Sequence, residues 1–346
     1  MMETALSERE RSVLEAVIRT YVETAEPAGS RTVAKRYGLG VSPATIRNAM
    51  SDLEDKGYLF HPHTSAGRIP TDQAYRYYVD TLMQPLKLSM AEQRRVRREL
   101  RETEGEGGAL AQLVRHAAQV LGLLTGDLGL AVAPKLEVAV LERIETALVS
   151  SEKVLLVLTL RGGLVRTIYV DLPVFMPAET LAAVTVVLNE RMAGQTLSEL
   201  RATLPERLRD AGAGDGSREL LNIVLQSADE LLEPAAEPVM LGNASVLASQ
   251  PEFAESERLR GLLELTEQRQ LLHQVLASRE HESAPFITIG SEHGHPRLSP
   301  FTLVTSRYRM GNLTGVVGVL GPTRMPYEKV AAIVEYTSRL MGELAT

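Results

Sequence analysis

The side chains with the clearest chemical potential lie in the run SPATIRNAMS, residues 42–51. Arg47 carries a guanidinium group and Asn48 an amide group, and both can make paired hydrogen bonds to the edge of a base in duplex DNA. The other hydrogen-bonding or small side chains of the run are Ser42, Ala44, Thr45 and Ser51. A helix that presents these side chains on one face could place its first turns in a DNA groove.

Two other groups of residues could carry chemistry. Glu292, His293 and His295, in the run GSEHGHP, are residue types that bind metal ions, but the run lacks the spacing of a regular element and a clear fourth ligand. A surface loop is therefore the simpler interpretation. Arg324, in the run GPTRMPYEKV, could help the start of a helix to bind an anion. The simpler interpretation here is a tight turn from a strand into a helix, capped by Thr323.

Composition and missing motifs limit the class of protein. The chain has no cysteine, which rules out disulfides, thiolate zinc sites, cysteine nucleophiles and thiol redox control. It contains no G-x-S-x-G, Walker or G-x-G-x-x-G pattern, so we expect no enzyme activity, no metal and no cofactor. No apolar run approaches the roughly 18 residues of a membrane-spanning helix, and the start MMETALSERE does not resemble a signal peptide. We expect a cytoplasmic protein that does not contact membranes.

The charge of the chain is unevenly distributed. The formal net charge is −7, from 44 acidic and 37 basic residues. Residues 195–250 contain nine acidic and four basic residues, whereas residues 28–51 contain no acidic residue and four basic ones, Arg31, Lys35, Arg36 and Arg47. Because a net charge averages over domains, the cationic stretch can still attract phosphates. Arg31 is predicted to make such a phosphate contact.

Three short helices are predicted to position the run SPATIRNAMS. Ser7 and Glu10 form a capping box ahead of the first helix. Its apolar residues recur at helical spacing, at Leu14, Val17, Ile18 and Tyr21. Ser30 is predicted to cap the second helix, which spans the run RTVAKRYG and ends at Gly38. The short turn LGVS then leads into the third helix.

The third helix has the pattern of a recognition helix. Ser42 is its predicted N-cap, Pro43 stands at the first helical position, and Gly57 follows its end. One stripe is apolar and is predicted to be buried, and it consists of Ile46, Ala49, Met50 and Leu53. The opposite face is free to contact DNA and carries Ala44, Arg47, Asn48 and Ser51, with Thr45 at its edge. The preceding turn completes a helix-turn-helix.

A β-hairpin is predicted to follow the third helix. The runs YLFH and RIP read as two strands around a turn at residues 63–67. Such a hairpin is a wing, which could place Arg68, with His63 nearby, against phosphates or the minor groove. Thr71 is predicted to cap a further helix that packs the wing against the three helices. The alternative is a small packed domain that binds another protein or nothing.

The remainder of the chain predicts an α+β architecture. The run MAEQRRVRRELRE is typical of a connecting helix, and EGEGG marks a flexible boundary. Runs rich in β-forming residues lie at 128–172 and at 285–321, and we expect them to form one sheet interrupted by an acidic, Leu-rich insertion at 194–250. The helix predicted within residues 252–278 could pack against this sheet or against a second subunit.

The sequence also resembles a known family. The run from Ser7 to Asp80, with its motifs SPATIRNAMSDLE and SAGRIPTD, resembles the N-terminal domain of the bacterial heat-inducible transcription repressor HrcA family. GVVGVLGPTRMPYEKV resembles the C-terminal region of that family, and NERMAGQTLSEL and SQPEFAE resemble its middle. The resemblance therefore covers essentially the whole chain.

The resemblance implies a domain organisation and a function. The implied domains are a winged helix-turn-helix at 1–83, a linker helix at 84–108, a GAF-like α/β domain at 109–193 and 251–346, and an inserted dimerisation domain at 194–250. The implied protein is a dimeric repressor that binds double-stranded DNA at an inverted-repeat operator upstream of chaperone operons. The chaperonin GroEL is implied as the partner that assists the repressor into its active state.

Three hypotheses stay open from the sequence. In the first, the chain is a DNA-binding repressor whose activity follows its folded fraction. In the second, the GAF-like domain binds a small metabolite that switches the same winged helix. In the third, the β-rich domain is an enzyme that uses His293 or His295, which the sequence supports least.

Overall fold

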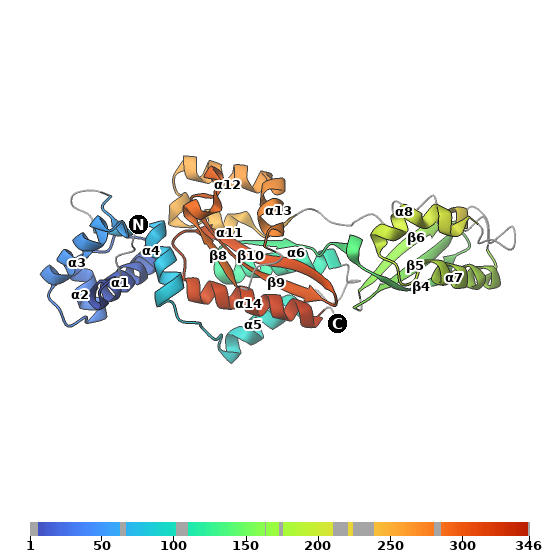
Figure 1. Ribbon diagram of the computed structural model, residues 1–346, viewed down its shortest axis with the longest axis horizontal. Coiled ribbons are helices and arrows are strands. Elements are labelled where there is room, and N and C mark those ends of the chain that lie inside the picture. Colours follow the sequence, from blue (N-terminus) through green and yellow to red (C-terminus); the bar gives the residue numbers. More distant parts are fainter. Residues whose placement is uncertain are drawn as a thin grey trace.

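The computed structural model describes residues 6–62, 67–101, 110–162, 164–172, 176–209, 221–223, 239–279 and 285–344. Figure 1 shows three parts along the long axis of the molecule: a helical N-terminal part in blue, a central part built on a sheet, and a smaller sheet with its own helices in yellow-green. The chain is thus a multidomain α+β protein. The predicted flexible boundary EGEGG and the tip of the predicted hairpin lie outside the described residues.

The N-terminal part begins with the three predicted helices, α1 (Glu8–Thr24), α2 (Ser30–Tyr37) and α3 (Pro43–Asp55). The capping box of Ser7 and Glu10 ahead of α1 is confirmed. Gly38 ends α2 with a left-handed φ of 54°, as predicted. The predicted N-cap of α2 is wrong: Gly29 takes that position, and Ser30 is the buried first residue of the helix. A buried side chain inside the helix cannot fold back to cap it.

A two-stranded hairpin follows, with β1 (Leu59–Phe60) paired antiparallel to β2 (Ile69–Pro70). Arg68 extends it, because its amide and carbonyl exchange hydrogen bonds of 3.0 and 2.9 Å with Ala28, between α1 and α2. A Cβ on Gly67 would lie 2.4 Å from the backbone of Ala28, so only glycine allows this approach. Thr71 caps α4 (Asp72–Tyr77), which continues as a π-helical turn from Tyr78 to Leu82.

The central part contains a five-stranded antiparallel sheet in the order β7-β3-β10-β9-β8. Its strands are β3 (Leu128–Val132), β7 (Met240–Leu241), β8 (Phe286–Ile289), β9 (Phe301–Met310) and β10 (Leu313–Pro322). One face packs against α6 (Leu110–Thr125) and α14 (Tyr327–Leu344), and α5 (Met90–Arg101) packs on these two helices. The other packs against α11 (Ala244–Ala248), α12 (Ser256–Glu267) and α13 (Arg269–Ala277). Alternate strand residues face opposite sides, so both faces are apolar.

The predicted helix within residues 252–278 is broken in two at Gln268, which joins α12 to α13. Leu262, Leu265, Leu272 and Leu276 from these helices are buried in the core on this side of the sheet. Of the two alternatives that the sequence left open, packing against the sheet is therefore confirmed within the chain. Leu263 points elsewhere and is 49% exposed.

The predicted single sheet is wrong, because the strands lie in two sheets. The second sheet consists of β4 (Leu141–Ser150), β5 (Lys153–Leu160) and β6 (Val165–Asp171), and it packs against α7 (Ala178–Met192) and α8 (Leu197–Leu208). The predicted insertion boundary at 194 falls between α7 and α8, whose leucines share one core with this sheet. The strand pattern of a sequence predicts strands but not which strands pair.

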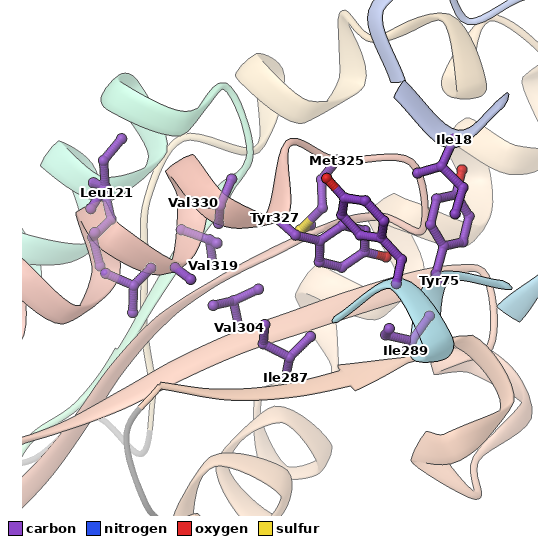
Figure 2. Packing of buried hydrophobic residues seen from close by; sticks show 14 of the residues in the cluster. Ile18, Tyr75, Leu121, Ile287, Ile289, Val304, Val319, Met325, Tyr327 and Val330 are labelled. Atoms are coloured by element: carbon purple, nitrogen blue, oxygen red, sulfur yellow. The ribbon is translucent and has the colours of Figure 1, made fainter. Parts of the chain in front are cut away.

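The N-terminal part and the central part share one continuous apolar core. Figure 2 shows Ile18 and Tyr75 from the N-terminal part beside Met325 and Tyr327 from the central part. The rings of Tyr75 and Tyr327 lie 5.6 Å apart between centroids. The core of the three helices is therefore continuous with the core of the central part.

Candidate nucleic-acid interface

The start of α3 has the geometry that the sequence predicts. The hydroxyl of Ser42 accepts a hydrogen bond from the amide of Thr45 at 3.2 Å and lies 3.0 Å from the hydroxyl of Thr45. Pro43 follows at the first helical position. Ser42 and Thr45 are thus engaged with each other in holding the first turn, and Thr45 is only half-buried. Ser42, Pro43 and Ala44 at this end of the helix are exposed to solvent, as a helix that enters a groove by its N-terminal end needs.

One face of α3 is free, and the predicted side chains lie on it. Ala44, Arg47, Asn48 and Ser51 are exposed, whereas the predicted stripe of Ile46, Ala49, Met50 and Leu53 is buried. Asn48 and Thr45 line a groove of ≈ 830 Å³ between α3 and the beginning of α1. The free face carries no other contact among the described residues, so its donors are available to a ligand.

The charge of α3 changes along its length. Arg47 lies in the second turn, and the last turn carries Asp52, Glu54 and Asp55. The carboxylates repel phosphates, so only the N-terminal half of the helix is suited to close contact with a polyanion. This asymmetry matches the way in which recognition helices enter a groove by their N-terminal end.

The two predicted phosphate contacts outside α3 have different surroundings. Arg31 is exposed at the start of α2. Arg68 is different, because its Nη2 lies 2.8 Å from Glu54 Oε2 and its side chain is only 19% exposed. Arg68 therefore ties the hairpin to α3, an interaction that the sequence did not indicate. His63, the third predicted residue of this group, lies outside the described residues.

A second ion pair ties α3 to α1. The ammonium group of Lys56, just after α3, donates a hydrogen bond to Glu10 Oε1. Glu10 is buried and also accepts hydrogen bonds from the amide and hydroxyl of Ser7, each at 2.8 Å. The hydrogen bond from Lys56 lowers the pKa of Glu10 to about 2, and it outweighs the opposite effect of burial. At neutral pH the Glu10 carboxylate is therefore ionised, and it joins the start of α1 to the end of α3.

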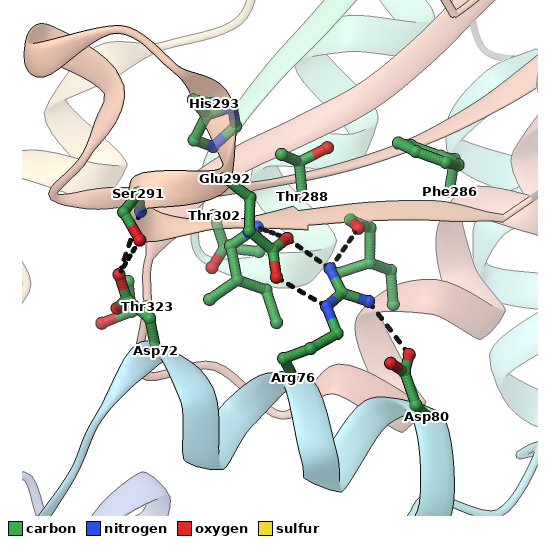
Figure 3. Close-up of polar contacts among 12 residues, drawn as sticks. Asp72, Arg76, Asp80, Phe286, Thr288, Ser291, Glu292, His293, Thr302 and Thr323 are labelled. Atoms are coloured by element: carbon green, nitrogen blue, oxygen red, sulfur yellow. Dashed lines mark hydrogen bonds and ion pairs between the residues drawn. The ribbon is translucent and has the colours of Figure 1, made fainter. Parts of the chain in front are cut away.

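Polar contacts join α4 to the central sheet, as Figure 3 shows. Arg76 donates hydrogen bonds to both carboxylate oxygens of Glu292, with Nε 2.7 Å from Oε1, and to the carbonyl of Ile287 at 2.7 Å. Asp72 accepts hydrogen bonds of 2.9 and 3.1 Å from the amide and hydroxyl of Ser291. The residues come from segments more than 200 positions apart, which no local pattern could bring together.

Glu292 and His293, considered above as metal-ligand types, have other contacts. Burial would raise the pKa of Glu292, but the hydrogen bonds from Arg76 and from the Ile289 amide outweigh it and lower that pKa. The His293 ring lies 3.2 Å from the carbonyl of Phe301. Within the residues that the structure describes, no three metal-ligand side chains come together.

Arg324 makes a second connection between the two parts. Its guanidinium donates to both oxygens of Glu252 and, at 2.7 Å, to the carbonyl of Val22 near the end of α1. It therefore contacts a carboxylate and a backbone group of the protein. A cleft of ≈ 700 Å³ beside it is lined by Tyr21, Arg258 and other residues of both parts.

Among the described helices, none is long and apolar enough to cross a membrane.

Comparisons with known proteins agree over the whole chain. The family model for the HrcA protein C terminal domain matches residues 111–331. The heat-inducible transcription repressor HrcA of Chlorobium phaeobacteroides (strain BS1) is 39% identical, and the alignment covers 97% of each chain. The protein with the same description from Pelotomaculum thermopropionicum is 34% identical over 98% of this chain and 97% of its own.

One solved structure has a similar fold throughout. A crystal structure described as that of a hypothetical protein superposes with a TM-score of 0.68 and 23% sequence identity, and it covers 99% of both chains. The likeness supports the α+β fold alone. Since the family model matches more than half of the chain, and the curated relatives align almost end to end, this chain belongs to the HrcA family of heat-inducible transcription repressors.

Proposed function

We propose that this protein represses the transcription of heat-inducible genes by binding double-stranded DNA. The names of its relatives support repression, and the free face of α3 supports DNA binding. The observation that carries the proposal is that Arg47 and Asn48 are exposed together on the N-terminal half of α3, while the apolar stripe of the same helix is buried. Residues 1–83 would then act as a winged helix-turn-helix.

Within this proposal the side chains divide by role. Base edges are contacted by Arg47, Asn48 and Thr45. The smaller side chains allow the helix to approach the DNA closely or bind the DNA backbone, and they belong to Ala44, Ser42 and Ser51. Arg31, Arg68 and His63 face phosphates or the minor groove. Arg68 is poised for this only in part, because Glu54 neutralises it.

We further propose a twofold dimer on an inverted-repeat operator upstream of chaperone genes. One recognition helix reads too few base pairs for tight binding, and an inverted repeat matches twofold symmetry.

The central sheet with its helices is proposed to be the GAF-like domain, and the dimerisation segment is proposed as an insertion into it. The chain leaves the five-stranded sheet after β3 and returns to it at β7. These two strands are neighbours, with Ala131 paired to Met240. This pairing favours an insertion longer than the predicted 194–250.

Activity is proposed to follow the folded fraction of the repressor, with the chaperonin GroEL returning it to the native state. The continuous core supports this idea, because loss of packing in the central sheet would also release α4 and α1. DNA binding would in turn stabilise the native state by mass action.

A second candidate function is control by a small metabolite. The ≈ 700 Å³ cleft favours it, because its walls come from α1 in the N-terminal part and from α12 and the β10–α14 connection in the central part. A ligand there would contact both parts and could change how the recognition helix is held.

The experiment that tests the proposed function is nuclease footprinting on the DNA upstream of the gene and of its chaperone operons. We expect protection of an inverted repeat by a particle whose mass, by light scattering, is that of a dimer. Equal binding to every duplex of the same length would contradict repression at an operator. A saturable effect of a metabolite on the footprint would favour the second candidate.

A further inference from the structure

A cluster of four side chains fixes how the proposed DNA-binding part sits on the central part. The cluster, which we call the clasp, consists of Asp72, Arg76, Ser291 and Glu292. Asp72 and Arg76 lie one turn apart on α4, and their partners follow directly after strand β8. In Figure 3 both α4 side chains point from the helix toward this loop.

Each side of the clasp consists of paired hydrogen bonds, between Arg76 and Glu292 on one side and between Asp72 and Ser291 on the other. The Arg76 guanidinium faces both oxygens of Glu292, and it also reaches the Ile287 carbonyl on the outer edge of the sheet and Asp80 at 3.1 Å. One carboxylate oxygen of Asp72 accepts both the amide and the hydroxyl of Ser291. Paired hydrogen bonds of this kind hold their partners within a narrow range of angles.

The loop is shaped to bring the two sides together. Gly290 has a φ of 55°, and a Cβ on it would lie 2.0 Å from the carboxylate of Asp72. A side chain at this position would therefore both strain the loop and displace Asp72. Glu292 is held in turn by the Ile289 amide, which donates to Oε2 at 2.9 Å.

The apolar contacts beside the clasp do not fix an angle as sharply. Tyr75 packs against Tyr327 with an interplanar angle of 44°, and such contacts tolerate sliding and rotation. The hydroxyl of Tyr78 donates to Glu328 and supports the same junction from the following turn. The clasp thus supplies the directional contacts on the α4 side of a junction whose attraction is mostly apolar, and Arg324 supplies others near the end of α1.

We infer that Arg76 and Glu292 are positioning residues that set the operator spacing the repressor accepts. This inference rests on the proposed function, in which two copies of α3 bind two half-sites. Each base pair inserted between half-sites rotates one of them by roughly 35° relative to the other. A DNA-binding part that is held at one angle accepts one spacing, whereas a part that can rotate accepts several.

The test begins with a duplex that the wild-type chain selects from random sequence. Its two half-sites are then separated or brought closer by one to three base pairs, and a duplex with a single half-site is included. Binding is measured by fluorescence anisotropy for wild type, Arg76→Ala, Glu292→Gln, the double variant and Gly290→Ala. Arg297→Ala is the matched control, because Arg297 is exposed on the same surface segment and lies outside the clasp.

Wild type and the control should bind the selected spacing about tenfold tighter than spacings changed by two base pairs, in line with the gain from simultaneous binding. The clasp variants should lose this preference to about twofold or less, with single half-site affinity unchanged, and the double variant should match either single variant. A wild-type spacing preference in Glu292→Gln, which is the variant least prone to misfold, would overturn the inference.

A second measurement does not depend on DNA. Because the chain has no cysteine, Asp55→Cys and Glu267→Cys give two unique spin-label sites, on the proposed DNA-binding part and on α12. The distance distribution should be narrow in wild type and broader in the clasp variants. Equal widths would overturn the inference. If wild type selects no duplex, the proposed function fails and this measurement alone decides whether the clasp positions the part.

Discussion

Lys56 and Glu10 form an ion pair between the end of α3 and the capping box of α1. The two residues are 46 positions apart along the chain, and Glu10 is almost fully buried. A buried carboxylate that loses its cationic partner keeps the cost of burial and loses the compensation. The pair therefore stabilises the packing that presents α3.

The stabilisation by Glu10 should depend on pH with a defined sign. Its pKa of about 2 in the folded chain lies below the ordinary 4.5, so its contribution is present above pH 4.5 and is lost as the pH falls toward 2. Lys56→Met should lower the free energy of unfolding by about 1 to 2 kcal/mol at pH 7 and by less at pH 3, because the hydrogen bonds from Ser7 remain and keep part of the shift. Urea titrations at both values measure it, with Lys35→Met as control. A pH-independent difference would contradict the assignment.

Base contacts by α3 should be visible as a loss of specificity. Asn48→Ala or Arg47→Ala should weaken binding to the selected operator by roughly 1 to 3 kcal/mol, with little effect on random DNA, because a base contact discriminates and a phosphate contact does not. Anisotropy titrations against both duplexes measure the ratio, and Arg297→Ala is the control. An equal loss on both duplexes would place α3 outside the major groove.

The Arg68–Glu54 pair makes a separate prediction about phosphate contact. Arg68→Ala should reduce the slope of log affinity against log salt by about one unit if Arg68 reaches a phosphate. Glu54→Gln should have the opposite effect and tighten binding to all DNA, because it frees a guanidinium that is now neutralised at 2.8 Å. If neither variant changes the slope, Arg68 serves only to hold the hairpin on α3. Arg31 is exposed and lies outside this pair, so Arg31→Ala gives the reduction in salt slope expected from the loss of one phosphate contact.

Asp127, ahead of β3, should make the chain less stable at high pH. Burial raises its pKa to about 7, and one carboxylate oxygen has no hydrogen-bond partner, while the other accepts from Gln250 at 3.0 Å. The pKa of Asp127 in the folded chain lies above the ordinary 3.8. Its contribution to stability is therefore fully present below pH 3.8 and is lost as the pH rises through 7. Between pH 5 and pH 8 the loss should be about 2 to 3 kcal/mol.

Asp127→Asn should remove this dependence and raise the melting temperature at pH 8 above that of wild type. Asp55→Asn, at an exposed position, is the control and should leave the profile unchanged. A wild-type profile in Asp127→Asn would show that another group is responsible. Thermal melts across the pH range measure the melting temperatures of Asp127→Asn and of the control.

Control through the folded fraction predicts a specific response to heat. Protein that has been heated and cooled should bind less operator in a gel shift, and chaperonin with ATP should restore binding, because a marginally stable fold shifts strongly with temperature. Chaperonin without ATP serves as the control. Full binding after heating, or no effect of chaperonin, would remove the folding mechanism and favour control by a metabolite.

The sequence by itself determined the local elements of the N-terminal part. The Ser7 and Glu10 capping box, the Ser42 and Pro43 start of α3 and the buried stripe of that helix all follow from short-range rules, because caps and helical faces involve residues three or four positions apart. The free face with Arg47 and Asn48 is predictable for the same reason. The N-cap lies at Gly29 and not at the predicted Ser30, because Ser30 is buried as the first residue of the helix, and no local pattern reveals burial.

Only the tertiary structure decided which strands pair and what the charged residues contact. The strands of the two sheets have similar composition, and their separation depends on cores that form between distant segments. Arg68, Arg76 and Arg324 look like free cations in the sequence, yet each meets a carboxylate. Such pairs form across 14, 216 and 72 positions, so they depend on chain topology and not on propensity. The clasp between α4 and the loop after β8 belongs to this second group.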